Sequence, residues 1–72
     1  MKITIGKLLL NYRNNRVYTS EEMAQKLGIN RSTYSLIEND HKNWLRQSTI
    51  RKIAELLSLT PDYIVSLLKG GK

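Results

Sequence analysis

The chain has 72 residues, with 12 Lys and Arg against 6 Asp and Glu, a net charge of +6 and no cysteine. This length predicts a single domain, residues 1–72, with a small core, and the lack of cysteine excludes a disulfide framework, a thiolate zinc site and a thiol nucleophile. The longest apolar run, residues 8–10, is far shorter than the roughly 18 residues that span a bilayer, and the N-terminus lacks the apolar region of a signal peptide, so we expect a cytoplasmic protein with no membrane partner.

The basic residues are unevenly distributed. Residues 1–20 contain Lys and Arg but no acidic residue, residues 26–52 hold six basic residues against Glu38 and Asp40, and the last twenty residues are neutral. Polyanions are the natural partners of such a surface. Ordinary surface charge is the alternative interpretation for a small domain.

The first helix is predicted at about residues 5–15. Apolar residues recur there at i, i+3, i+4 and i+7, which is the buried stripe of a surface helix: Ile5, Leu8, Leu9 and Tyr12. Thr4 can cap its start, and the turn-favouring pair Asn14 and Asn15 indicates its end.

Two short helices then follow across Thr19 to Glu38. Thr19 and Glu22 form the pattern of a capping box, which begins the second helix, and Gly28 supplies the left-handed conformation that ends it. Asn30 is a good cap for a third helix at residues 31–38. Tyr34 and Ile37 lie three residues apart and are predicted to point inward, which leaves Arg31, Ser32, Ser35 and Leu36 facing outward.

Residues 39–47 are predicted to form a polar loop before two more helices. Gln47 or Ser48 begins the fourth helix, whose apolar stripe is Ile50, Ile53, Ala54 and Leu57. Thr60 as cap and Pro61 at the first helical position begin the fifth, and residues 70–72 are predicted to be a short flexible basic tail. With no strand-like alternation, the fold class is all-α, a compact bundle of five helices.

Taken together, these features resemble the Cro and phage-repressor type helix-turn-helix proteins, the xenobiotic-response-element (XRE) family. The resemblance extends from Ile5 to about Leu68. It depends on several short motifs in the right order, namely Ile5-Gly6 with Leu9, Tyr12 and Arg13, then the segments at 21–28, 31–33, 37–39 and 52–57.

The resemblance implies that the chain binds double-stranded DNA, with the third helix in the major groove and the second crossing the backbone. Arg31 is then the first choice for guanine, Ser32 and Ser35 can bond to base edges, and Leu36 can pack on a thymine methyl. Phosphate contacts are expected from Ser20, Asn30, Thr33, Asn39, Lys42 and Arg46. The family pattern also implies a structural salt bridge between Arg13 and Glu38, which we favour over a DNA contact for Arg13.

Two positions depart from the family pattern. Ser20 stands where the family usually has Gln, and its short hydroxyl reaches less far. Val17 replaces the family's Gly before the second helix, so we expect this turn to take a conformation that a β-branched residue allows.

Several alternatives stay open at this stage. The fifth helix is more apolar than one buried face needs, so its residues Ile64, Val65, Leu67 and Leu68 are divided between the core and a two-fold dimer interface.

The function we favour is a transcriptional repressor that binds a near-palindromic operator as a homodimer; the alternative is a protein-interaction module of the same fold, such as an antitoxin or antirepressor-type partner. Trp44 is expected to fold back over the core; the alternative is that it inserts into DNA or contacts a partner. A lone His41 cannot build a metal site or a catalytic dyad, so we expect no metal, no cofactor and no enzyme activity.

Overall fold

The computed structural model describes residues 3–42 and 44–70, which form five α-helices and no strand. The all-α prediction is therefore confirmed, with the second and third helices joined as a helix-turn-helix. The tail predicted at 70–72 begins inside the last helix, and its final two residues lie outside the described part of the chain. The helices are α1 (Ile5–Arg16), α2 (Ser20–Leu27), α3 (Arg31–Glu38), α4 (Gln47–Leu57) and α5 (Pro61–Gly70).

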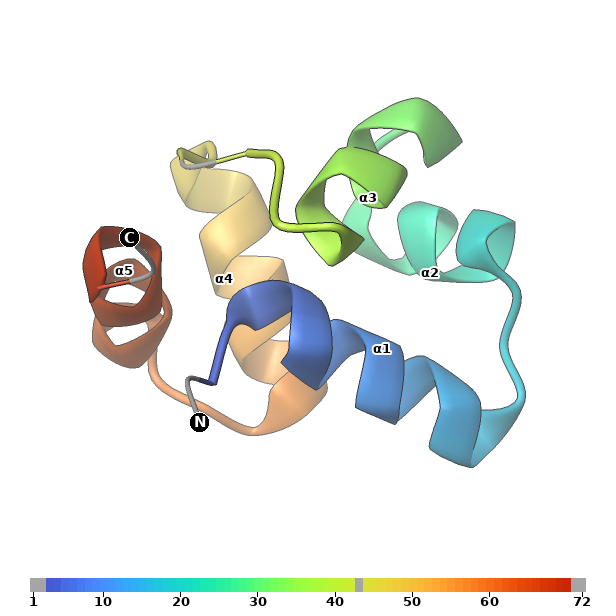
Figure 1. The fold of residues 1–72 in the computed structure, drawn as a ribbon, viewed down its shortest axis with the longest axis horizontal. Coiled ribbons are helices and arrows are strands. Elements are labelled where there is room, and N and C mark those ends of the chain that lie inside the picture. Colours follow the sequence, from blue (N-terminus) through green and yellow to red (C-terminus); the bar gives the residue numbers. More distant parts are fainter. Residues whose placement is uncertain (1–2, 43, 71–72) are drawn as a thin grey trace.

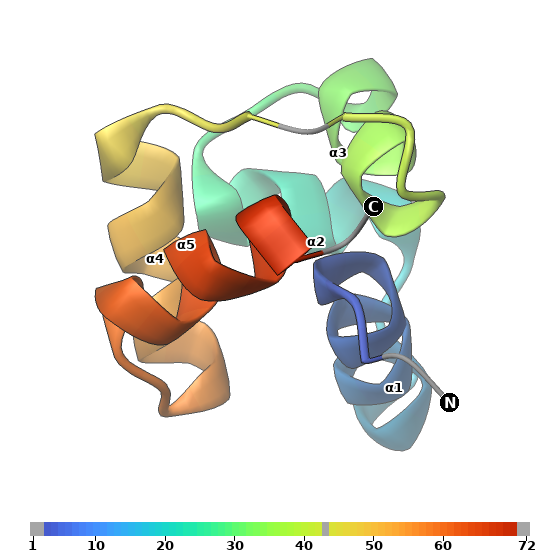
Figure 2. The same ribbon diagram turned by 60° about the vertical axis from the view of Figure 1, so that its left-hand side comes forward.

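The helices pack as two pairs joined by α1. The pair α2 and α3 lies on one side of the molecule and the pair α4 and α5 on the other, while α1 contacts α3, α4 and α5 (Figure 1). The turned view shows α5 lying across α4 (Figure 2). This arrangement leaves α3 and the loop that follows it at one edge of the molecule.

Apolar residues from all five helices meet in a single core. The predicted inward-facing residues of α3 are buried, as are three of the four predicted in α4, where Leu57 is only half-buried. The residues that α2 buries are Met23, Ala24 and Leu27. Of the two places left open for the apolar residues of α5, Ile64 occupies the core, because it is 0% exposed. Val65, Leu67 and Leu68 are half-buried and pack against the core. The core residues are Ile5, Leu9, Met23, Ala24, Leu27, Tyr34, Ile37, Ile50, Ile53, Ala54 and Ile64.

Local caps explain where four of the helices begin. The Thr4 side chain accepts from the Lys7 amide, and Asn30 accepts from the Thr33 amide, so the first turns of α1 and α3 are closed. Both bonds of the capping box between Thr19 and Glu22 are present at α2, and the Thr60 hydroxyl accepts from the amide of Tyr63 at α5. Each cap satisfies amide groups that have no partner inside the helix.

A close contact fixes the start of α1 against the end of α3. The Asp40 carboxylate accepts from the Gly6 amide at 3.2 Å and from the Thr4 hydroxyl at 2.9 Å, so it caps a helix 34 residues away in sequence. A Cβ at Gly6 would overlap the carbonyl oxygen of Glu38. Only glycine permits this approach, which sets the position of the C-terminal end of α3.

The turn between α1 and α2 differs from the expectation. Val17 has φ 56° and ψ 42°, in the left-handed region, and its side chain is 87% exposed. This region is unfavourable for a β-branched residue. Val17 nevertheless has the backbone conformation that a glycine would adopt, and the turn does not change its geometry to suit valine. The reason is that its amide and that of Tyr18 donate to carbonyl groups in the last turn of α1, and these bonds need the left-handed geometry.

Candidate nucleic-acid interface

The four residues expected to read bases lie together on the exposed face of α3. Arg31, Ser32, Ser35 and Leu36 line one shallow hollow of about 410 Å³, which we call the α3 hollow. Leu36 is 47% exposed even though it is a large apolar residue. The hollow therefore combines a guanidinium, two hydroxyls and an apolar side chain, which are groups that can recognise base edges and thymine methyls.

The spacing of buried residues in α3 produces this face. Tyr34 and Ile37 point into the core, so the positions at 31, 32, 35 and 36 turn toward solvent on a helix with 3.6 residues per turn. The Asn30 cap, whose Oδ1 accepts from the Thr33 amide at 2.7 Å, fixes the direction of the first turn. Arg31 and Ser32 stand in that turn.

The other end of α3 is held by a network around Glu38. Arg13 from α1 donates from Nε to Glu38 Oε2 at 2.9 Å and from Nη2 to Oε1 at 3.3 Å. The Tyr34 hydroxyl also donates to Oε2, at 2.7 Å, and Arg13 Nη1 donates to the Tyr18 carbonyl. The structure thus contains the expected ion pair between Arg13 and Glu38, and neither residue lines the α3 hollow.

This network changes the ionisation of its members. The hydrogen bond to Glu38 raises the pKa of Arg13 above its ordinary value, and burial opposes this effect only in part. Burial, followed by the bond to the Glu38 carboxylate, raises the pKa of Tyr34 far above its ordinary value. Tyr34 therefore stays a neutral donor and Arg13 a cation, so the Glu38 carboxylate has complementary partners under physiological conditions.

A second groove lies beside the α3 hollow, between the start of α3 and the start of α4. It has a volume of about 570 Å³, and we call it the Trp44 groove. Four of the six expected phosphate ligands line it: Asn30, Thr33, Lys42 and Arg46. The α4 helix starts at Gln47 with no side-chain hydrogen bond from its N-cap residue, Arg46.

Ser20 and Asn39, the remaining two expected phosphate ligands, line neither concavity. Ser20 is the half-buried first residue of α2. The side-chain nitrogen Nδ2 of Asn39 donates to the backbone carbonyl of Ser35 at 2.9 Å and to the Ser35 hydroxyl at 3.4 Å. Asn39 thus completes the C-terminal end of α3, and its role as a phosphate ligand stays a prediction.

Two residues of the Trp44 groove were not indicated as site residues by the sequence patterns. Trp44 was expected to fold back over the core, but it is 59% exposed, and the Lys42 ammonium lies 4.3 Å from the centroid of its ring. Lys52 reaches the groove from α4 and covers Gly28 with its ammonium group. The signal that could have found Lys52 is its position off the apolar stripe of α4; no local pattern places the side chain of a loop Trp.

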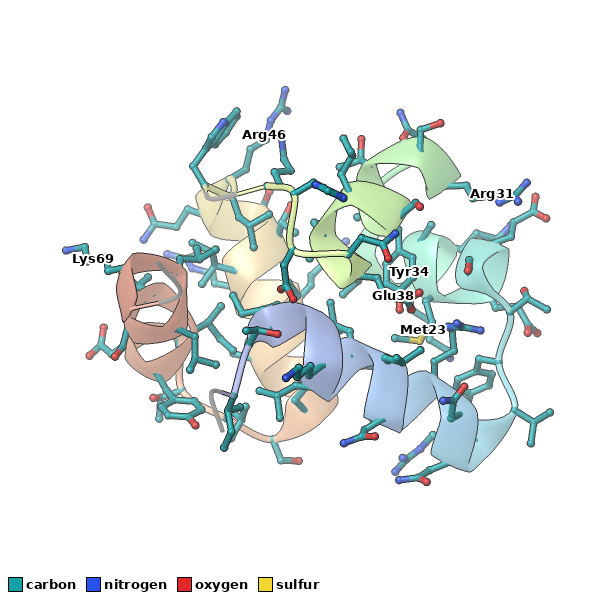
Figure 3. The ribbon with its side chains drawn as sticks, in the orientation of Figure 1. Met23, Arg31, Tyr34, Glu38, Arg46 and Lys69 are labelled. Atoms are coloured by element: carbon teal, nitrogen blue, oxygen red, sulfur yellow. The ribbon has the colours of Figure 1, made fainter. Side chains whose placement is uncertain are left out.

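Basic side chains mark the same edge of the molecule. Arg31 extends outward from the start of α3 and Arg46 from the loop before α4, whereas Lys69 extends from α5, on the side away from α3 (Figure 3). No Asp or Glu is among the described residues that line either concavity. The edge therefore offers hydrogen-bond donors and positive charge to a ligand.

Other kinds of site are not apparent in the described residues. Across 3–42 and 44–70, no three His, Asp or Glu side chains gather where they could hold a metal ion. Within the same ranges, no helix has the length and apolar character needed to cross a membrane.

Comparison with known proteins identifies the family. Residues 6–69 match the family described as a helix-turn-helix domain, which covers all but the ends of the chain. The chain belongs to the helix-turn-helix domain family. In DNA-binding helix-turn-helix domains the second helix of the motif is the recognition helix, and α3 occupies that position in this chain.

A weaker similarity connects this helix-turn-helix domain with a larger protein. The chain is 28% identical over 65 residues to the type II methyltransferase M.Sau96I of Staphylococcus aureus. The match covers 90% of the chain but only 15% of the length of that methyltransferase. A search of solved structures finds no significant match.

Proposed function

We propose that this helix-turn-helix domain is a sequence-specific regulator of the Cro and phage-repressor (XRE) type. In this proposal it binds double-stranded DNA, represses transcription and places α3 in the major groove. The observation that carries the proposal is the α3 hollow, where Arg31, Ser32, Ser35 and Leu36 stand together and exposed. Packing of the core does not require an exposed Leu beside an Arg and two Ser, but base readout makes use of all three residue types.

We further propose that the domain acts as a homodimer on a near-palindromic operator. One α3 of eight residues reads few base pairs, whereas two half-sites one helical turn apart multiply the information. In the proposed dimer, the half-buried Val65, Leu67 and Leu68 of α5 contact a second copy. The role of the domain is binding, and the proposal includes no catalytic step.

Selection of bound duplexes from random-sequence DNA tests the proposal directly. A two-fold symmetric consensus is the expected result. Recovery of no preferred sequence, combined with tight binding to a protein partner, would instead favour a protein-interaction module of the same fold.

The variant Arg31→Ala tests the role of the α3 hollow. Loss of a two-bond contact to guanine is expected to weaken binding to the selected duplex by about 1–3 kcal/mol and to relax one base position. Lys69→Ala is the matched control, because it removes one positive charge from α5, far from α3 (Figure 3). Both affinities are measured by fluorescence anisotropy of a labelled duplex; equal effects of the two substitutions would contradict the assignment of Arg31 as a base reader.

A further inference from the structure

The tryptophan of the groove beside α3 is not explained by the packing of the fold. Trp44 is 59% exposed, although it is the largest apolar side chain in the protein and the only tryptophan in it. Large aromatic side chains normally bury most of their surface, and those that stay exposed are common at binding interfaces. The exposure of Trp44 therefore indicates that a ligand covers the ring when it binds.

The ring is held in an orientation by a cation. The Lys42 ammonium lies 4.3 Å from the ring centroid, which is within the range of a cation–π contact. Since Lys42 occupies one face, only the other face and the edge of the indole can contact a ligand. Ordering the ring before binding lowers the entropy that binding must overcome.

The surroundings of the ring determine the chemistry of this ligand. Lys42, Arg46 and Lys52 line the groove, together with the polar side chains of Asn30 and Thr33 and no acidic residue. An anion fits such a lining. A ligand that also covers an aromatic ring must present an apolar face close to its negative charge.

A strand of duplex DNA has this alternation, because each anionic phosphate adjoins a deoxyribose with an apolar face. Asn30 and Thr33 of the groove lie on the same first turn of α3 as Arg31 and Ser32 of the α3 hollow. A strand whose bases face the α3 hollow therefore has its sugar–phosphate backbone within reach of the groove. Both the position of the groove and the chemistry of its lining therefore favour the sugar–phosphate backbone of DNA as the ligand.

We propose that Trp44 is a DNA-contact residue whose indole packs against a deoxyribose of the backbone that flanks the bases facing α3. Lys42 orients the ring, and its charge attracts the adjoining phosphates together with those of Arg46 and Lys52. This inference rests on the proposed DNA-binding function. It adds a contact that is apolar and independent of base sequence to the readout by α3.

The single tryptophan makes the inference directly measurable, because the emission of the protein on selective excitation reports on Trp44 alone. The selected duplex is titrated into the protein while binding is followed independently by anisotropy of a label on the DNA. We expect the Trp44 emission to change with the same midpoint as the anisotropy, and quenching by acrylamide, a neutral quencher, to fall severalfold in the complex.

Substitutions give a second readout. Trp44→Ala is expected to weaken binding about 3- to 10-fold by removing an aromatic contact, and to a similar extent for the selected and a random-sequence duplex, because sugar contacts carry no base information. Trp44→Phe, which keeps an aromatic ring, should retain most of the affinity. Tyr63→Ala, which truncates an exposed aromatic residue of α5, is the control and should bind normally.

The failure of this inference can be told apart from that of the proposed function. Binding by anisotropy with unchanged Trp44 emission and quenching would overturn the Trp44 contact and leave the proposed function intact. Emission changes caused by an acidic peptide or a free nucleotide, but not by the duplex, would overturn it in favour of another ligand. If no duplex changes the anisotropy, both proposals fall.

Discussion

Glu38 makes most of the polar side-chain contacts between α3 and α1. It accepts from both Arg13 and Tyr34, and its side chain is only 13% exposed. A charge so placed requires hydrogen-bonded partners. Both carboxylate oxygens accept from these partners, so Glu38 acts as a structural residue that fixes the C-terminal half of α3 against α1.

Tyr34 makes this network sensitive to high pH. The raised pKa of its hydroxyl means that the folded state favours the neutral phenol, so the stabilisation is fully present below the ordinary value of 10.0 and is lost as the pH rises above it. Tyr34→Phe is expected to lower the free energy of unfolding by about 1–3 kcal/mol at neutral pH, because a hydrogen bond to a charged group is lost.

Urea denaturation at a series of pH values measures this effect. The difference between the wild-type protein and Tyr34→Phe should shrink as the pH rises from 9 to 11, around the ordinary tyrosine pKa. Comparison at each pH cancels the titration of groups that both proteins share. A difference that stays constant across this range would show that Tyr34 does not titrate with unfolding.

At the scale of elements, most helix boundaries could be predicted because the signals are local. The caps Thr4, Thr19, Asn30 and Thr60 and the stop at Gly28 act within four residues, and all five are present in the structure. The end of α1 at Arg16 lies one residue beyond the prediction. The exposed face of α3 was predictable for the same reason, since the inward positions of Tyr34 and Ile37 determine it.

The features that the sequence patterns missed depend on distant contacts. Asp40, which lies just beyond the C-terminal end of α3, caps the start of α1. No local sequence pattern predicts a contact between residues so far apart in the chain. The same holds for Trp44, whose exposure depends on how the loop crosses from α3 to α4. Periodicity also could not divide the apolar residues of α5 between core and surface, and only the packing shows that Ile64 belongs to the core.

The end of α1 offers a test of backbone conformation. Val17 adopts φ 56° with its side chain almost fully exposed, so replacement by glycine removes the steric cost and little packing. The left-handed conformation costs a non-glycine residue about 1–2 kcal/mol. Glycine avoids this strain, but its greater backbone freedom in the unfolded chain costs about 0.5–1 kcal/mol on folding. Val17→Gly is thus expected to raise the free energy of unfolding by roughly 0.5–1 kcal/mol.

Val17→Ala is the matched control for this prediction, because alanine keeps the Cβ that conflicts with the left-handed backbone. Denaturant midpoints of the three proteins should place the glycine variant highest. A glycine variant less stable than both others would mean that the Val17 side chain contributes packing that outweighs its conformational cost.

At the scale of the whole molecule, charge and shape act together. The net charge is +6, and the edge that carries α3 holds Arg31, Lys42, Arg46 and Lys52 in two adjoining concavities without an acidic residue. The Glu38 carboxylate is neutralised by Arg13 on the inner side of α3. The field at this edge is therefore positive, which attracts DNA before any base is recognised.

This charge distribution predicts a steep response of DNA affinity to salt. In the proposed dimer, the three cations of the Trp44 groove in each chain would make about six phosphate contacts, and each contact contributes about −0.9 to the slope of log K against log salt. The slope should then be about −5, which corresponds to roughly a thousandfold loss of affinity between 50 and 200 mM salt. A single bound chain would give about half that slope, so the same measurement reports the stoichiometry.

Lys52→Ala separates the groove from general electrostatic attraction. The substitution removes one phosphate contact per chain, so the slope of the dimer should become shallower by about 1.8 units, whereas Lys69→Ala on α5 should leave it unchanged. Anisotropy titrations of one duplex at four or more salt concentrations provide both slopes. If the two variants changed the slope equally, phosphate attraction would be spread over the whole surface, and the Trp44 groove would have no special part in it.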